Sequence, residues 1–240
     1  MQELARVVGA SLSTVHRDLD YLSENRYVER TRGGAHRAGH LLSTTFEPDY
    51  EIGRHTRAGE KAAIGRDAAG LVRAGDCIFF DSSTTVLEAA KAVAANRYAV
   101  TGITNDLGIA MQLAQCTSIR TIVPGGTVRA RSFTLFGEPG IALLARMHVD
   151  IAFIGTHSLA DGLLSDTSLE IVQSKQAILR ACGRSVLLAD SSKFSARRSF
   201  LTIASLDDVD TLVTDYGIKD DDAQRVRDSG VTLRLAQVES

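Results

Sequence analysis

Gly75–Val93 reads GDCIFFDSSTTVLEAAKAV and changes its physical character twice within one short segment. Cys77–Phe80 is an apolar run entered through a Gly-Asp pair, which predicts a buried strand, although so short a run does not by itself exclude a helix. Asp81–Thr85 then contains only small polar residues. Apolar side chains follow at helical spacing, at Val86, Leu87, Ala90 and Val93. We therefore expect a strand, a polar turn and a helix in this order.

Two roles are open for this polar turn. The backbone N–H groups and hydroxyls at the start of a helix form an anion site, because the positive end of the helix dipole lies there. Alternatively, Asp81, Ser82 or Ser83 only caps the helix. The turn alone does not separate a bound anion from a simple cap.

The composition is that of an ordinary globular protein. The chain has 240 residues, enough for one large or two modest domains, with 44% hydrophobic and 23% charged residues. No run has the length of a membrane span or the form of a signal peptide, so we expect a soluble, cytoplasmic protein. The three cysteines and six histidines lack the spacing of a metal site or a disulfide framework, so we expect no metal and no cofactor.

The beginning of the chain predicts two short helices across a tight turn. Gln2–Val8 has apolar residues at helical spacing and is followed by a glycine. Ser13 is the expected N-cap of a second helix, whose inward stripe is Val15, Leu19 and Leu22. A strand at Tyr27–Arg30 and a glycine-containing hairpin tip resemble a wing. This order is typical of a winged helix-turn-helix, although a plain helical hairpin fits the spacing equally well.

If the module binds DNA, the second helix enters the major groove and the wing contacts phosphate. We then expect DNA contacts from the exposed polar side chains of both elements: Ser13, Thr14, His16, Arg17, Arg30 and Arg32. Residues 1–40 carry six Arg against five Asp or Glu, whereas the whole chain has a net charge of −2. This weak asymmetry favours DNA at the N-terminal end but provides no strong non-specific attraction.

The run ELARVVGASLSTVHRDLDYLSENRYVERTRGGA at residues 3–35 resembles the winged helix-turn-helix of the DeoR family of bacterial transcriptional repressors. His16 stands where that family usually has Arg, and Arg32 where it often has His. The family module normally has another helix before the one near Gln2. The resemblance therefore implies an N-terminally incomplete DNA-binding domain at 1–38, followed by a linker at 39–60.

From residue 61 onward, strand-like and helix-like segments alternate, which predicts a mainly parallel α/β sheet covered by helices on both faces. The expected strands are Cys77–Asp81, Ala99–Thr104, Ile119–Val123, Ile151–Gly155, Val186–Asp190, Leu212–Asp215 and Val231–Leu235. One expected helix starts at Lys61. The others cover Val86–Ala95, Leu107–Gln115, Pro139–Met147, Leu169–Cys182 and Asp220–Asp228.

Polar residues follow the expected strands where parallel strands end at one edge of a sheet, which is where such sheets bind ligands. Each polar cluster alone is ordinary turn chemistry. Together they predict a crevice in which Gly125-Gly126 allows close backbone approach and Lys175 or Lys193 supplies a cation.

Residues 61–215 are also similar to the sensor domain of the DeoR family. The similarity rests on Lys61, DSSTT at 81–85, Thr104-Asn105, Gly125-Gly126, Gly137, Gly155, LLADSSKF from Leu187, and Thr214-Asp215. Such domains resemble ribose-phosphate isomerases and coenzyme A transferases in fold and bind phosphorylated sugars. The resemblance implies that Ser82, Ser83, Thr84 and Thr85 hold phosphate, and that Asp81, Asn105, Lys175 or Asp190 hold sugar hydroxyls. The complete expected effector site is Asp81, Ser82, Ser83, Thr84, Thr85, Thr104, Asn105, Gly125, Gly126, Gly155, Lys175, Asp190 and Lys193.

Three functions remain open. The first is a repressor that binds operator DNA as a dimer or tetramer and is released by a phosphorylated sugar bound in an effector-sensing domain at 61–240. The second is a sugar-phosphate isomerase, for which Glu138, Asp166 and Glu170 are the available carboxylate bases. The third is an oligomeric sensor that does not bind DNA.

Overall fold

The computed structural model describes residues 1–24, 27–37, 50–130, 132–194 and 197–238, and the chain divides into two compact units, Met1–Phe46 and Glu47–Ser240. Part of the predicted linker, 39–49, lies outside the described residues. The rest of it is not a loop, because it forms helix α3 (Tyr50–His55) and the first residues of helix α4 (Ala58–Ala69). Among the described residues, no helix is long and apolar enough to cross a membrane.

The N-terminal unit has the order predicted for a winged helix-turn-helix. Helices α1 (Gln2–Val8) and α2 (Leu12–Glu24) are joined through Gly9, whose φ of 66° is left-handed. Strands β1 (Val28–Thr31) and β2 (Gly34–Arg37) pair antiparallel as the wing. Ala5, Val15 and Leu19 form the small core. The predicted N-cap is wrong: Ser13 lies inside α2, and the Ser11 hydroxyl accepts the Thr14 N–H at 3.1 Å.

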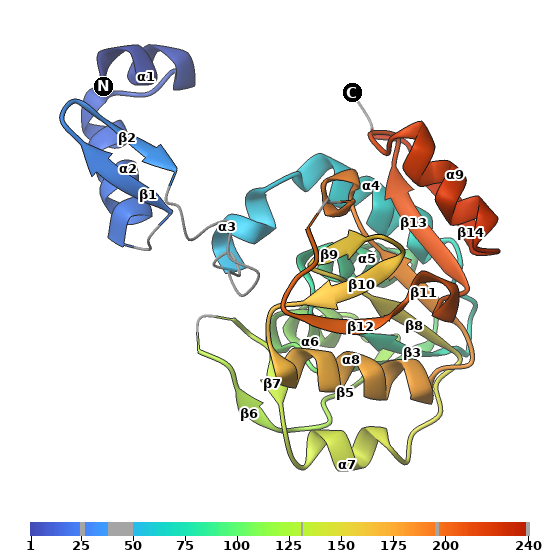
Figure 1. The fold of residues 1–240 in the computed structure, drawn as a ribbon. Coiled ribbons are helices and arrows are strands. Elements are labelled where there is room, and N and C mark those ends of the chain that lie inside the picture. Colours follow the sequence, from blue (N-terminus) through green and yellow to red (C-terminus); the bar gives the residue numbers. More distant parts are fainter. Residues whose placement is uncertain (25–26, 38–49, 131, 195–196, 239–240) are drawn as a thin grey trace. The chain divides into compact units, whose positions relative to one another are not determined.

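The C-terminal unit is built on one parallel sheet (Figure 1), as the alternating sequence pattern predicts. Its strands lie in the order β14-β13-β11-β8-β3-β4-β5, with parallel pairing throughout. Their bounds are β3 (Cys77–Phe80), β4 (Val100–Thr104), β5 (Ile119–Ile122), β8 (Ile151–Ile154), β11 (Ser185–Leu188), β13 (Thr211–Asp215) and β14 (Thr232–Ala236). Each predicted strand is present, with its ends shifted by at most two residues.

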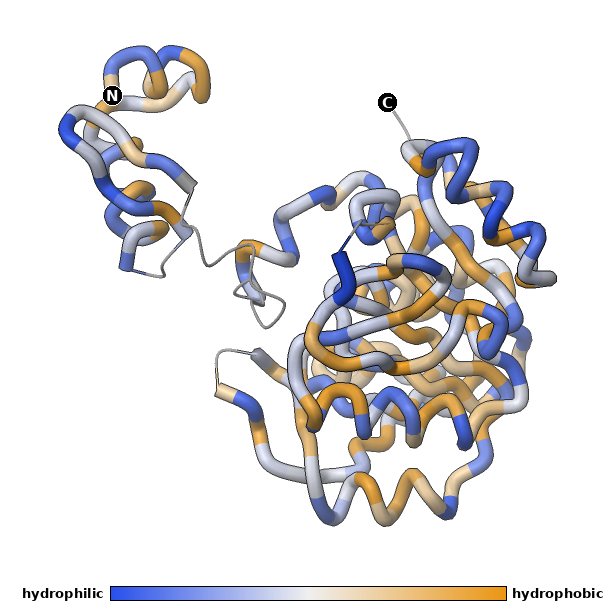
Figure 2. The backbone as a smooth tube through the Cα atoms, in the orientation of Figure 1, coloured by the Kyte–Doolittle hydropathy of each residue, from blue (hydrophilic) through white to orange (hydrophobic). Residues whose placement is uncertain are grey.

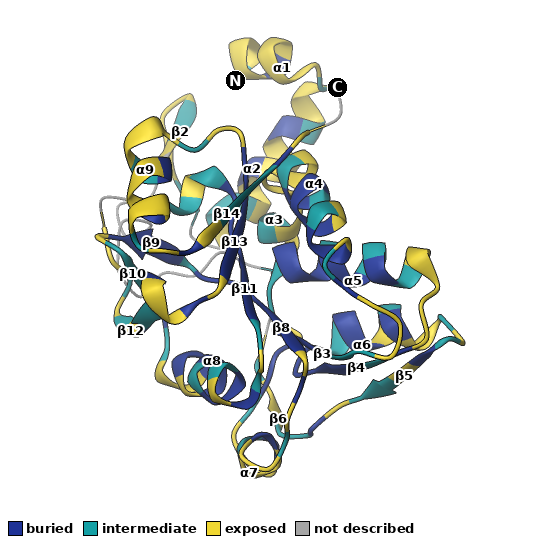
Figure 3. Cartoon of the chain, turned by 90° about the vertical axis from the view of Figure 1, so that its right-hand side faces the viewer, coloured by how far each residue is buried: buried dark blue, intermediate teal, exposed yellow. Residues whose placement is uncertain are grey.

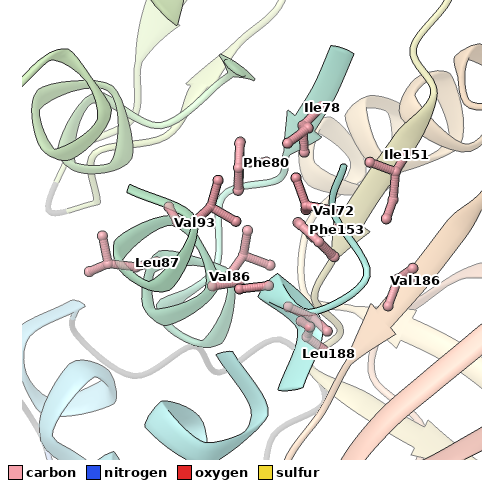
Figure 4. Close-up of a cluster of buried hydrophobic side chains, with 14 of the residues drawn as sticks. Val72, Ile78, Phe80, Val86, Leu87, Val93, Ile151, Phe153, Val186 and Leu188 are labelled. Carbon is pink, nitrogen blue, oxygen red and sulfur yellow. The ribbon is translucent and has the colours of Figure 1, made fainter. Parts of the chain in front are cut away.

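Helices cover both faces of this sheet. They are α4, described above, and α5 (Thr84–Asn96), α6 (Leu107–Ala114), α7 (Gly140–Leu144), α8 (Leu169–Ala181) and α9 (Asp220–Asp228). One face packs against α4, α5 and α6, and Figure 4 shows part of this core, including Phe80 and Phe153, whose rings are 5.6 Å apart. The other face packs against α7 and α8. The central strands are buried in Figure 3, as expected for a sheet covered on both faces.

A small antiparallel sheet was not predicted. Strands β9 (Ser158–Ala160), β10 (Leu163–Asp166) and β12 (Leu201–Ser205) pair in the order β12-β10-β9. Their apolar side chains pack with Leu187 and Leu212 of the large sheet and with Val226 of α9. In Figure 2, α9 combines hydrophilic and hydrophobic residues, which fits a helix with one buried side. A two-stranded hairpin, β6 (Thr127–Val128) and β7 (Leu135–Phe136), was also missed.

Candidate functional site

The large sheet reverses its direction of growth between β3 and β8. From β3 the chain continues through α5 to β4 and β5 on one side, whereas β8, β11, β13 and β14 lie on the other. The loops that follow β3 and β8 therefore leave the sheet in opposite directions. Open α/β sheets bind ligands at the carboxyl ends of the strands beside such a point. Asp81, Ser82 and Ser83 follow β3, and Gly155 follows β8.

The hydroxyl-rich turn after β3 does cap helix α5, as one of the two sequence interpretations predicts. Ser83 is the N-cap residue, and its hydroxyl accepts the Thr85 N–H at 3.2 Å. The Ser82 N–H donates to the Asn105 side-chain oxygen at 3.1 Å, which joins the turn to the end of β4. Ser82 and Thr84 are only partly buried. The cap therefore leaves the hydroxyls of Ser82 and Thr84 free of the capping bond at the positive end of α5.

A buried ionic cluster lies at the same switch point. The Lys175 ammonium donates to Asp81 Oδ2 and, at 2.8 Å, to the Gly155 carbonyl oxygen. The Gly155 N–H donates to Asp81 Oδ2 at 3.1 Å, and Asp166 Oδ2 lies 3.8 Å from the ammonium. Burial raises the pKa of Asp81, and Lys175 opposes this effect. The cluster thus joins β3, β8, β10 and α8 around one lysine.

Two polar atoms of this site have no hydrogen-bond partner among the residues that the structure describes. They are Asp81 Oδ1 and Asn105 Nδ2, on side chains that are 0% and 4% exposed. Buried polar groups are nearly always paired, because an unpaired group costs about 1–3 kcal/mol. An acceptor and a donor are therefore both available, and a polyhydroxyl ligand can satisfy both at once.

Gly155 and Ser83 fit together so closely that position 155 does not accept a larger residue without movement. A Cβ atom at Gly155 would lie 2.5 Å from both Cβ and Oγ of Ser83. The Ser83 side chain thus occupies the space that the missing Gly155 side chain leaves. Ser83 adds its volume on the β8 side of the turn.

The glycine pair after β5 packs against another part of the chain, whereas the sequence predicted that it would allow close backbone approach in a ligand crevice. Gly125 and Gly126 have φ values of 93° and 131°, and a Cβ atom at Gly126 would lie 2.6 Å from the Phe136 carbonyl oxygen. The Gly126 backbone thus approaches β7, and a Cβ atom at Gly125 would lie 3.3 Å from Pro139, which gives the pair a packing role. Thr104 is fully buried, and its hydroxyl accepts the Asp106 N–H at 3.1 Å.

Asp190 and Lys193 follow β11 and lie beside residues that the sequence analysis left out of the site. Asp190 Oδ1 accepts the Ser192 N–H at 3.0 Å and lies 3.7 Å from Arg57 Nε. Lys61 is 5% exposed, and burial, and after it the charge of Lys193, lower its pKa to about 8. A signal for Lys61 was present, because it shares the apolar face of its helix with Ile64 and Ala68.

The carboxylates considered for an isomerase do not converge. Asp166 belongs to the buried cluster, but Glu138 accepts the exposed Ala142 N–H at 3.2 Å and Glu170 is exposed in the first turn of α8. Within the described part of the chain, no group of three His, Cys, Asp or Glu side chains is placed to hold a metal ion.

The residues predicted to contact DNA are mostly exposed on α2 and the wing. Arg17 is 80% exposed, and His16, Ser13 and Arg32 are exposed as well. Thr14 is partly buried, and its hydroxyl lies 2.9 Å from that of Ser11. Arg30 differs, because its guanidinium is 3.4 Å from His16 Nδ1 and 3.4 Å from Asp20. Arg30 thus connects the wing to the exposed face of α2.

Comparison with known proteins covers both units. Residues 1–39 match the family described as the DeoR-like helix-turn-helix domain, and residues 56–216 match the DeoR C terminal sensor domain. The HTH-type transcriptional regulator GlpR of Haloferax volcanii is 29% identical over 242 residues, covering 97% of this chain and 89% of that protein. The glycerol-3-phosphate regulon repressor of Escherichia coli is 29% identical over 215 residues, covering 89% and 83%. A structure of ribose 5-phosphate isomerase A from Methanocaldococcus jannaschii has a TM-score of 0.43 at 18% identity, covering 57% of this chain and 54% of the isomerase.

Proposed function

Because the chain belongs to the DeoR family of helix-turn-helix transcriptional regulators, we propose that it is a cytoplasmic repressor of a carbohydrate operon whose release from DNA is triggered by a phosphorylated sugar. The observation that carries this proposal is the pair of unpartnered buried atoms, Asp81 Oδ1 and Asn105 Nδ2, beside the hydroxyl turn. The phosphate binds at the start of α5, and the sugar hydroxyls bind to the Asp81 and Asn105 side chains. The related glycerol-3-phosphate regulon repressor supports a phosphorylated effector.

The DNA side of the proposal rests on α2 and the wing. Thr14, His16 and Arg17 contact base edges in the major groove, and Ser13 and Arg32 contact phosphate. Because one short helix offers few contacts, two copies related by two-fold symmetry bind two half-sites, as a dimer or a tetramer. Effector and DNA then weaken each other's binding by the same factor.

Thermal unfolding of the full chain tests the effector. The panel contains glycerol 3-phosphate, glucose 6-phosphate and ribose 5-phosphate, each paired with its unphosphorylated parent. A ligand at a hundred times its dissociation constant adds about 2.7 kcal/mol, which raises the midpoint by roughly 5 to 10 °C for a chain of this size. A shift with one phosphorylated sugar but not with its parent supports the proposal. Equal shifts for both members of a pair argue against a phosphate subsite.

Thr84→Val provides a matched variant, because it keeps the shape of the side chain and removes the hydroxyl. We expect this variant to unfold at nearly the wild-type midpoint without ligand and to lose most of the ligand-induced shift. An undiminished shift would mean that Thr84 only begins the helix. Gel retardation then measures operator binding with and without the same sugar phosphate. Loss of operator binding in its presence would show that effector binding in one unit affects DNA binding in the other.

A further inference from the structure

Arg30 lies on the side of the wing that faces helix α2. Val28, two residues earlier in β1, packs against the small core of the N-terminal unit. Residues two apart in a strand share one face, so the Arg30 side chain leaves β1 on the side of α2. Its guanidinium Nη2 lies 3.4 Å from His16 Nδ1 and 3.4 Å from Asp20 Oδ1. Because His16 and Asp20 are four residues apart on one face of α2, Arg30 bridges them.

The bridge determines where the His16 ring carries its proton. A guanidinium has only N–H donors, so His16 Nδ1 accepts this hydrogen bond with its lone pair. In a neutral imidazole the proton then lies on the other ring nitrogen, Nε2. His16 is exposed, and its Nε2 has no hydrogen-bond partner among the residues that the structure describes. The ring therefore offers one N–H donor from the exposed face of α2.

Asp20 restricts the position of the Arg30 guanidinium. The Arg30 and Asp20 side chains are 34% and 61% exposed, and an exposed ion pair of this kind adds little to the stability of a protein. Its consequence is geometric, because a carboxylate on one side and an imidazole on the other leave the guanidinium little freedom. The wing residue thereby fixes the orientation of a side chain on α2 that lies fourteen residues earlier in the chain.

The base edges in a major groove differ in what they offer to an N–H donor. Guanine presents two acceptors, N7 and O6, whereas adenine presents one acceptor beside an amino donor, and cytosine presents an amino donor. A side chain fixed as a donor therefore pairs best with guanine and worst with cytosine. An imidazole with its proton on Nδ1 would have the opposite preference, because its Nε2 would accept from an amino group.

We infer that Arg30 is a positioning residue for DNA recognition, which holds His16 as an Nε2–H donor that selects guanine at one position of each half-site. This inference rests on the proposed function, in which α2 enters the major groove. Arg30 acts through His16 and contacts no base itself. The base preference of α2 at that position thus depends on a residue of the wing.

Selection of binding sites by the full chain from a library of random DNA duplexes tests this inference. Low salt allows variants with fewer phosphate contacts to bind as well. The wild type should enrich a site with guanine at a position where His16→Ala loses this preference. Arg30→Ala should reduce the preference at the same position by about fivefold or more and keep the preferences at the others. Arg30→Lys keeps a cation that only donates and should restore part of it.

Arg32→Ala is the matched control, because it removes the same charge from an exposed position of the wing. It should weaken binding to all sequences alike and leave the guanine preference unchanged.

Nitrogen NMR of the free protein locates the proton of the His16 ring without DNA, and His16→Ala identifies the signal. At about pH 8, where histidine side chains are ordinarily neutral, the wild type should carry the proton on Nε2 alone. Arg30→Ala should show a mixture of the two neutral forms, because no donor then faces Nδ1.

The outcomes separate this inference from the proposed function. A proton on His16 Nδ1 in the wild type, or a guanine preference that Arg30→Ala keeps, overturns the inference and leaves the proposed function standing. A uniform loss over all sequences in Arg30→Ala assigns Arg30 to phosphate contact and also overturns it. A wild type that enriches no site overturns both the inference and the DNA side of the proposed function. Loss of one guanine preference in both His16→Ala and Arg30→Ala, with the wild-type proton on Nε2, supports the inference.

Discussion

At the residue scale, Gly155 and Ser83 show how the hydroxyl-rich turn after β3 and the end of the neighbouring strand β8 determine each other's side chains. Gly155→Ala places a methyl group 2.5 Å from the Ser83 side chain, so we expect a loss of about 1–3 kcal/mol in the free energy of unfolding. Urea denaturation measures this loss. Ser83→Gly alone should cost only a few tenths of a kcal/mol, because glycine is a tolerated N-cap.

The double variant Gly155→Ala with Ser83→Gly is the control for that prediction. It should recover most of the stability, since the space vacated at position 83 accepts the new methyl group. A double variant as unstable as the sum of the two single variants would show that Gly155 is required for another reason.

The lowered pKa of Lys61 predicts that the free energy of unfolding depends on pH. Its pKa falls from 10.5 to about 8 on folding, so between these values the unfolded chain holds a proton that the folded chain has lost. The stability of the wild type relative to Lys61→Met should therefore rise with pH from about 8 to 10.5, by at most about 3 kcal/mol. Urea denaturation across this window measures the difference, with Lys219→Met, which removes an exposed lysine, expected to follow the wild type. A flat difference would mean that Lys61 titrates normally.

The candidate-site residues that the sequence predicts are those that belong to a local pattern. Asp81–Thr85 and Asn105 follow apolar runs, and the structure joins them by the Ser82–Asn105 hydrogen bond. The sequence did not predict the positions of Arg57 and Lys61 beside the site, since their contacts with Ser191 and Gly53 depend on how distant or separate elements pack. Ser11 was missed as the cap of α2 because Ser13 is an equally good cap by residue type.

At the element scale, α4 and α5 cross at Gly65 with no room for a side chain. A Cβ atom there would lie 2.5 Å from the Glu88 carbonyl carbon and 2.7 Å from the Ala89 nitrogen. We expect Gly65→Ala to destabilise the protein by about 1–3 kcal/mol although alanine is the better helix former, because the backbone of α5 cannot move aside as a side chain can. Thermal unfolding measures the change.

Gly59→Ala in the same helix is the matched control. Its Cβ atom would make an ordinary contact, 3.4 Å from a methyl group of Val238. It should leave stability unchanged or slightly higher. If both substitutions have the same effect, then helix propensity and not the crossing of α4 and α5 controls this position.

The predicted elements were those with a strong internal signal. Buried parallel strands are continuous apolar runs, and the helices between them carry apolar stripes. The large sheet could therefore be predicted from the sequence. The antiparallel sheet could not, because β10 ends in Ser165 and Asp166, two polar residues whose burial depends on contacts with Thr156 and Lys175. The pair β6 and β7 contains two residues per strand, too few for any periodicity.

At the scale of the whole molecule, the two units should lose their functions separately. Arg17→Ala removes an exposed side chain of α2, so specific operator binding should weaken by roughly 1–3 kcal/mol if Arg17 contacts a base. Affinity for the sugar phosphate should stay unchanged. Gel retardation at several salt concentrations and calorimetry measure the two affinities.

Arg227→Ala removes the same charge from the exposed side of α9 and should leave specific operator binding as it is. Equal operator affinity in Arg17→Ala and the wild type would exclude Arg17 from base recognition. A uniform loss over all DNA sequences would instead assign Arg17 to phosphate contact.

The order of strands in the large sheet also determines when a newly made chain can fold. Strand β3 pairs with β4, which follows it closely, but also with β8, where Ile78 lies opposite Ile151. Arg234 of β14 then binds Asp67 of α4, which leaves the ribosome 167 residues earlier. The apolar surfaces of α4 and β3 therefore cannot be fully buried until most of the chain has been synthesised. This delay slows folding and leaves these segments exposed to chaperones and to aggregation.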